Sequence, residues 1–227
     1  MLNLKDYKRI VIYQYGKVGS RTMYTTLKKY HKNVHHMHFL RKKNMNKISK
    51  NGTLIITIVR NVYDRNISNM FQNIKASNND FYYGQKIKNI NLNKLMIHYR
   101  KANIKHTNRL LIPWFKKFKK DIGVDIFSKE FNMEDKYNIY KETDKTIITL
   151  RFEDIAEWDK ILSNIFGREI ILKSSNVSKD KVYNKLYKQF RKNYKYTKEE
   201  IQIIDTTDHL SYFYTPDEIE GFKNNYK

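Results

Sequence analysis

Hydrophobic residues gather in four short stretches rich in β-branched and aromatic side chains, at 10–15, 34–39, 54–59 and 146–150. The first and third are almost continuously apolar, which is typical of parallel strands covered on both faces. Apolar positions at helical spacing occur at 20–30, 62–77, 92–119 with a break near Pro113, 155–166, 179–192 and 216–224. This alternation predicts an α/β protein, a three-layer sandwich in which helices flank a central parallel sheet of four to five strands.

The chain of 227 residues contains no linker rich in Pro, Gly or Ser, so we expect a single domain over 1–227. It has no cysteine, which suits a reducing compartment and excludes a disulfide framework and thiolate metal sites. No apolar run reaches the roughly 18 residues that a membrane span requires. We therefore expect a cytoplasmic protein without a transmembrane segment.

The chain has 45 basic and 23 acidic residues, which gives a net charge of +22. A positive potential of this size attracts negatively charged molecules, so we expect an anionic partner. The surplus is mostly lysine among abundant Asn, Ile and Tyr, a mixture that an AT-rich genome also produces without selection for binding. Lysine pairs such as Lys116-Lys117 are more typical of solvated helix faces than of a nucleic-acid groove. We expect no specific nucleic-acid partner.

The first predicted strand runs directly into Gly16-Lys17-Val18-Gly19-Ser20-Arg21-Thr22. Two glycines allow a tight turn and a close approach to an anion, the N–H groups that begin the next helix point at it, and Lys17 adds a positive charge. A Walker A loop places its lysine after the second glycine, so this loop does not indicate a magnesium–ATP site. The segment predicts a phosphate cradle, with an ordinary strand-to-helix turn as the alternative.

A second candidate follows the third predicted strand, where Arg60 lies at the carboxyl end and Ser68 about two helical turns further on. Open α/β sheets bind ligands at this end of their strands, and a guanidinium together with a hydroxyl can hold one phosphate. The alternative is that Arg60 pairs with a nearby carboxylate and Ser68 packs against a neighbouring helix.

The second predicted strand ends in His35-His36-Met37-His38, in which His36 and His38 share one face. A neutral imidazole is a suitable general base near pH 7. The alternatives are histidines that fill the strand end and a carboxylate base from elsewhere in the chain. We expect no metal site, because the chain offers no cysteines and no obvious third ligand.

Together, Lys17 to Thr22 and the Arg60 to Ser68 spacing resemble the two nucleotide motifs of the sulfotransferases that use 3′-phosphoadenosine-5′-phosphosulfate (PAPS). Leu150-Arg151-Phe152-Glu153-Asp154-Ile155 resembles the family's fourth-strand ending, with Phe152 in place of a tyrosine. The stretch 178–183 is similar to the basic loop that closes over the 3′-phosphate late in the chains of this family. By this resemblance, Lys179 and Lys181 would contact the 3′-phosphate. Further segments, among them Tyr-Gly-Lys-Val-Gly-Ser and His-x-His-Phe-Leu, are similar to bacterial proteins assigned to capsular polysaccharide synthesis.

The resemblance implies a P-loop-like sulfotransferase fold and transfer of a sulfuryl group from PAPS to a carbohydrate hydroxyl, with the bisphosphate PAP as product and without a metal. The acceptor is expected to be a carbohydrate, with an acidic polysaccharide or its precursor as one candidate, and nothing in the sequence specifies which sugar it is. Lys17 would act on the leaving group and His38 would be the base with His36 assisting. The donor would bind to Gly16, Lys17, Val18, Gly19, Ser20, Arg21, Thr22, Arg60, Ser68, Lys179 and Lys181. The alternatives are a kinase-like or other nucleotide-dependent group transferase and a non-catalytic protein that binds polyanions or nucleic acid.

Overall fold

A five-stranded sheet forms the centre of the fold in the computed structural model, which describes residues 1–40, 48, 51–74, 90–105, 113–173 and 182–226. Its strands are β1 (Arg9–Tyr13), β2 (Val34–Met37), β3 (Thr53–Val59), β4 (Tyr137–Lys141) and β5 (Lys145–Arg151). They lie in the order β2-β1-β3-β5-β4. Every residue of β3 is buried, as expected of an apolar strand between two parallel neighbours, β1 and β5.

The expectation of a wholly parallel sheet is wrong at one edge, because β4 pairs antiparallel with β5. The two strands form a hairpin in which Glu142 N donates to the carbonyl of Lys145 over 2.9 Å. Along β4 buried and more exposed residues alternate, the pattern of an edge strand with one covered face. That mixture of apolar and polar residues is why the apolar runs did not reveal this strand.

The described residues contain nine α-helices, and the chain divides into two compact units. Unit 1 comprises residues 1–60 and 114–176, and unit 2 comprises 61–113 and 177–227. The prediction of one domain over 1–227 stays a prediction. None of the described helices combines the length and apolar composition needed to cross a membrane.

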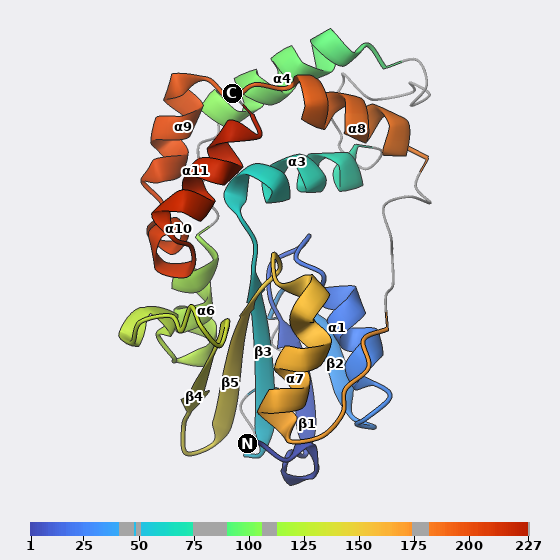
Figure 1. Ribbon diagram of the computed structural model, residues 1–227, viewed down its shortest axis with the longest axis vertical. Coiled ribbons are helices and arrows are strands. Elements are labelled where there is room, and N and C mark those ends of the chain that lie inside the picture. The colour runs from blue at the N-terminus through green and yellow to red at the C-terminus, as the bar shows by residue number, and fades with distance from the viewer. Residues whose placement is uncertain (41–47, 49–50, 75–89, 106–112, 174–181, 227) are drawn as a thin grey trace. The chain divides into compact units, whose positions relative to one another are not determined.

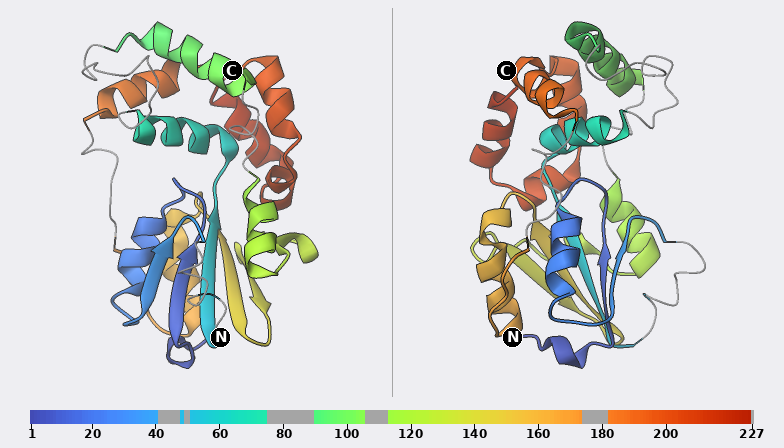
Figure 2. Two further views of the ribbon diagram at one scale, coloured as in Figure 1. Left: turned by 180° about the vertical axis from the view of Figure 1, so that it is seen from behind. Right: turned by 90° about the vertical axis from the view of Figure 1, so that its right-hand side faces the viewer.

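Unit 1 holds the sheet, with helices on both of its faces (Figures 1 and 2). On one face, α1 (Ser20–Leu27) and α7 (Trp158–Phe166) bury their apolar stripes against β1 and β3. On the other, α6 (Trp114–Ile122) packs against β1: the ring of Tyr13 lies 4.9 Å from that of Trp114. Short 3₁₀ turns at Leu4–Asp6, Ile126–Ser128 and Ile155–Glu157 complete the unit.

Unit 2 is helical. Its elements are α3 (Val62–Asn73), α4 (Leu92–Lys105), α8 (Asn184–Asn193), α9 (Lys198–Asp205), α10 (Asp208–Phe213) and α11 (Pro216–Asn224). The pattern of apolar residues predicted α11 with the observed bounds and α3, α4 and α8 with different ends, but not the short helices α9 and α10. Tyrosine and phenylalanine rings from α3, α4, α8 and the segment after α8 pack edge to face in its core, among them Phe71, Tyr99 and Phe190.

A buried carboxylate organises this aromatic core. Glu200 is fully buried at the start of α9, where it forms a capping box with Thr197. The Asn103 amide donates to Glu200 Oε1 over 3.0 Å, and the Tyr194 hydroxyl donates to the same oxygen over 2.6 Å. Burial first, and the Glu200 charge second, raise the pKa of Tyr194 far above its ordinary value, so the phenol stays a donor.

We predict that Glu200→Ala lowers the free energy of unfolding by about 3 kcal/mol, because it leaves the Asn103 and Tyr194 donors buried without an acceptor. The matched control is Glu218→Ala in the second capping box, formed with Thr215 at the more exposed start of α11. There we expect a loss of about 1 kcal/mol or less. Urea unfolding measures both, and equal losses would contradict the role assigned to Glu200.

Candidate functional site

The Gly16 to Thr22 loop lies in unit 1, directly after β1 and at the start of α1. Gly19 is the residue before the helix, with φ of 75°, and it offers no side chain to cap the first N–H groups. Val18 is 3 % exposed and belongs to the hydrophobic core, so it anchors the loop. Ser20 and Thr22 are buried, whereas Arg21 is exposed. The loop has the backbone features of an anion cradle.

Lys17 adopts a left-handed backbone conformation with φ of 75°, which is uncommon for a residue other than glycine. Strain of this kind costs about 1 kcal/mol or more and persists only where the surroundings hold it. Here the carbonyl of Lys17 accepts a hydrogen bond from Arg60 Nη1 over 3.0 Å. Arg60, the first residue of the motif after β3, is therefore in direct contact with the loop after β1 within unit 1.

Phe152 joins these two motifs to a third. Its ring lies under the Arg60 guanidinium, with 4.3 Å between the guanidinium carbon and the ring centroid. The same ring borders Gly19, where an added Cβ would lie 3.0 Å from Phe152 Cδ2 and 3.0 Å from Trp158 Cη2. A side chain at this position would require the Phe152 and Trp158 rings to shift by a few tenths of an ångström, in addition to the strain of a positive φ. Arg60 Nε is buried and has no hydrogen-bond partner among the described residues.

The neighbours of Phe152 hold it in place. Arg151 donates from Nε and Nη2 to the Asp154 carboxylate over 2.7 and 2.9 Å, and both side chains are buried. Trp158 Nε1 donates to the Arg151 carbonyl over 2.9 Å. The Arg151 to Asp154 pair is thus a structural ion pair that fixes the strand end.

His38 lies just past the end of β2, and its ring nitrogen Nδ1 is 3.0 Å from the carbonyl oxygen of Gln14. A carbonyl can only accept, so the proton must be on Nδ1, and in the neutral ring the lone pair is then on Nε2. This tautomer leaves Nε2 able to take a proton.

His36 lies beside His38, with ring centroids 4.6 Å apart. Burial lowers the pKa of His36 from 6.5 to about 4, and the charges of His38 and Arg21 contribute to the same shift. His36 Nε2 is buried without a hydrogen-bond partner among the described residues. His36 is therefore a neutral imidazole at pH 7.

For three predicted phosphate ligands, Ser68, Lys179 and Lys181, a role at the loop stays a prediction. Ser68 belongs to α3 in unit 2, whereas Arg60 belongs to unit 1, so their joint role stays a prediction. Lys179 and Lys181 lie outside the described residues. Within the described part of the chain, no three His, Asp or Glu side chains come together as a possible metal site.

Sequence reasoning missed Gln14. It follows β1 and is fully buried, yet neither atom of its side-chain amide has a hydrogen-bond partner among the described residues. Buried amides are almost always paired, and unpaired ones are found where a ligand or water completes the site. The available signal was a single amide between Tyr13 and Tyr15 at the end of an apolar strand.

We predict that Gly19→Ala destabilises the protein by about 2 kcal/mol, because a Cβ there combines a positive φ with contacts to Phe152 and Trp158. Gly16→Ala is the matched control, since nothing lies within 4 Å of its added Cβ, and it should cost less than about 0.5 kcal/mol. Gly123→Ala isolates the backbone term, with φ of 82° and open space around it. Urea unfolding should rank Gly19→Ala above both.

The lowered pKa of His36 also predicts a pH dependence of stability. Between about pH 4 and 6.5 the folded protein binds fewer protons at His36 than the unfolded chain does, so the free energy of unfolding falls as the pH falls through this window. Allowing for partial exposure, we expect a loss of about 1–2 kcal/mol from pH 7 to pH 4.5. His36→Gln should lose correspondingly less in parallel urea titrations, and an unchanged pH dependence would refute the assignment.

The chain was also compared with known proteins. No protein-family model matches it, and neither a curated protein nor a solved structure matches it.

Proposed function

We propose that the protein is a PAPS-dependent sulfotransferase with a P-loop-like sulfotransferase fold, acting on a carbohydrate in the synthesis of capsular or other surface polysaccharide. The observation that carries the proposal is the hydrogen bond from Arg60 to the Lys17 carbonyl, which connects the Lys17 loop to the first residue of the second segment that resembles a nucleotide motif. The order β2-β1-β3 adds support. At β1 the order of strands reverses, and ligands of open α/β sheets bind outside the carboxyl ends at such a point.

The donor would be held mainly through its phosphates. Backbone N–H groups at the start of α1 and the hydroxyls of Ser20 and Thr22 would bind the 5′-phosphosulfate, with the partial positive charge of the helix N-terminus behind them. Arg60, whose Nη1 is engaged by the loop, has its Nε without a partner among the described residues to offer to a phosphate oxygen. Ser68 would assist at the 3′-phosphate.

In the proposed reaction His38 would accept the proton, and Lys17 would stabilise the negative charge on the leaving group. His38 Nε2 takes the proton from the acceptor hydroxyl as its oxygen bonds to sulfur, and the bond between sulfur and the phosphate oxygen of the donor breaks. The Lys17 ammonium stabilises the charge that develops on that leaving oxygen. His36 assists by remaining neutral, so that it places no second positive charge beside His38 when the latter is protonated.

The donor assignment is tested by calorimetric titration with PAP, ATP and a generic oligonucleotide. We expect saturable binding of PAP, weaker binding of ATP, and oligonucleotide binding that falls steeply with salt. Binding of ATP without binding of PAP would support a kinase-like transferase instead. Binding of the oligonucleotide alone would support the polyanion-binding alternative.

The role of Lys17 is tested in the same experiments. Lys17→Ala should reduce turnover of PAPS with polysaccharide acceptors at least about 100-fold while weakening PAP binding less, because its charge acts mainly on the leaving group. Lys29→Ala, which removes an exposed lysine just after α1, is the matched control and should leave turnover within about twofold. Near-normal turnover of Lys17→Ala would refute this mechanism.

A further inference from the structure

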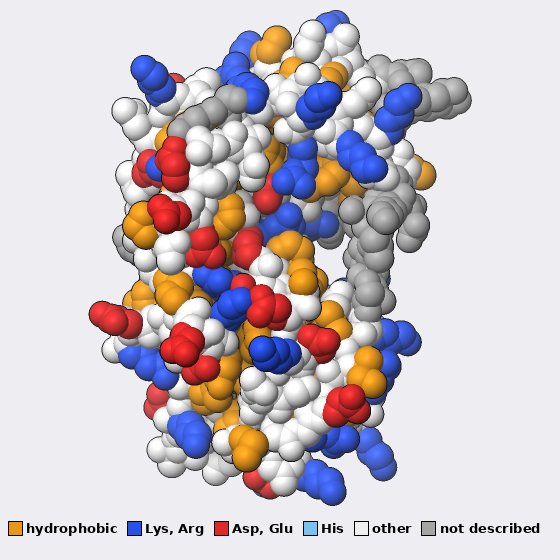
Figure 3. All heavy atoms as spheres, in the orientation of Figure 1, with side chains coloured by type: hydrophobic (Ala, Val, Ile, Leu, Met, Phe, Trp, Pro, Cys, Tyr) orange, Lys and Arg blue, Asp and Glu red, His pale blue; other side chains and the backbone are white. Residues whose placement is uncertain are grey.

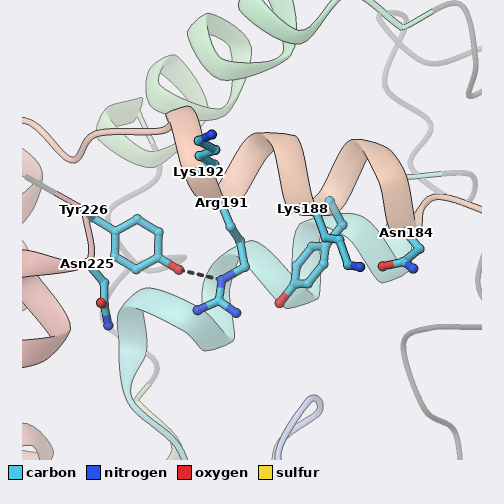
Figure 4. A pocket seen from close by; sticks show the side chains of 7 residues that line it. Asn184, Lys188, Arg191, Lys192, Asn225 and Tyr226 are labelled. Carbon is cyan, nitrogen blue, oxygen red and sulfur yellow. Dashed lines mark hydrogen bonds between the residues drawn. The ribbon is translucent and has the colours of Figure 1, made fainter.

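A cavity of about 460 Å³ lies on one side of α8 in unit 2. Its size falls within the range of about 300–1,000 Å³ that is usual for small-molecule sites. Asn184, Tyr187, Lys188 and Arg191 line it from α8, at the spacing that places residues on one helix face (Figure 4). Tyr226, after α11, lies beside Arg191 at one end of this row.

The cavity is basic because of how charge is distributed along α8. The helix contains four basic residues and no acidic one, in the sequence NKLYKQFRKN. Leu186 and Phe190 are its buried positions, so the basic residues are left to the remaining faces. In Figure 3, Lys and Arg side chains gather over α8, whereas Asp and Glu side chains gather over α9 to α11.

One of the cavity's cations is fixed and another is not. Arg191 donates from Nη2 to Asp64 over 2.6 Å and from Nε to the Tyr226 hydroxyl over 3.2 Å, and Tyr226 also donates to Asp64. Asp64 therefore orients the guanidinium and offsets part of its charge. Lys188 has no ion-pair partner in the part of the chain that the structure describes. The cavity therefore keeps a net positive charge, and its Arg191 guanidinium is held in place by Asp64 and Tyr226.

We propose that this cavity binds an anionic sugar unit, one that carries a carboxylate or a phosphate group. Lys188 and Arg191 would bind the charged group, the amides of Asn184 and Asn225 would donate to and accept from hydroxyls, and Tyr187 would contact the ring. The choice of a sugar over a nucleotide rests on the proposed function, because the donor is assigned there to the Lys17 loop. The cavity is then a subsite for an acidic polysaccharide acceptor.

Calorimetry on the full chain tests this with four probes: a glucuronate-containing tetrasaccharide, glucose 6-phosphate, a neutral N-acetylglucosamine tetrasaccharide and inorganic sulfate. We expect the acidic tetrasaccharide or the phosphosugar to bind at least about tenfold more tightly than the neutral sugar and the sulfate. Lys188→Ala should weaken that binding about fivefold. Lys185→Ala, on the same helix but outside the cavity lining, should change it less than about twofold.

Because Lys188 is exposed, its substitution should leave the melting temperature unchanged, which excludes misfolding as the cause of lost binding. Equal binding of neutral and acidic sugars, sulfate bound as tightly as the sugars, or a Lys188→Ala variant that binds normally would each overturn the proposal. So would competition between PAP and the acidic sugar, which would make the cavity a nucleotide site. If the sugar binds through Lys188 but PAP does not bind at all, the proposed reaction fails and the sugar site stands.

Discussion

The arrangement of unit 1 depends on the parallel pairing of β3 with β1. Ile10 lies opposite Leu54 and Ile12 opposite Ile56, and the apolar side chains of both strands are buried. With this register fixed by the burial of both strands, the Lys17 loop and Arg60 leave the sheet at the same edge. The hydrogen bond from Arg60 to the Lys17 carbonyl then follows from proximity.

The register of the sheet also explains why the Phe152 ring contacts Arg60 and borders Gly19. β5 pairs in parallel with β3 on its other side, with Arg151 opposite Val59, and Phe152 N donates to the Val59 carbonyl over 2.8 Å. The ring therefore arrives at the same edge as Arg60 and Gly19. The buried ion pair between Arg151 and Asp154 and the hydrogen bond from the Trp158 indole to the Arg151 carbonyl fix this strand end, and with it the position of the Phe152 ring.

The elements that could be predicted are those whose burial is visible in the sequence. β1, β3 and β5 are apolar runs and α6 has a strongly amphipathic pattern, so each was found with errors only at its ends. β4 alternates polar and apolar residues, and α9 is stabilised by Glu200, a charged residue whose burial depends on Asn103 far away in the chain. Likewise, Lys17 and Arg60 could be proposed as phosphate ligands from the sequence, because Lys17 lies between two glycines and Arg60 lies eight residues before Ser68. The burial of the Gln14 amide and the cavity on α8 could not be proposed, because both arise only when segments distant in the sequence pack together.

The left-handed conformation of Lys17 makes sense in light of these contacts. A glycine would adopt it without strain, but it would bring no charge to the loop. Lysine brings the charge, and the strain is opposed by the anchoring of Val18 in the core and by the Arg60 hydrogen bond to the Lys17 carbonyl. Arg60 therefore has two roles: one of its nitrogens holds the backbone that positions Lys17, while another remains without a protein partner among the described residues. A lysine at position 60 would lack the fork that allows both, because it carries a single nitrogen.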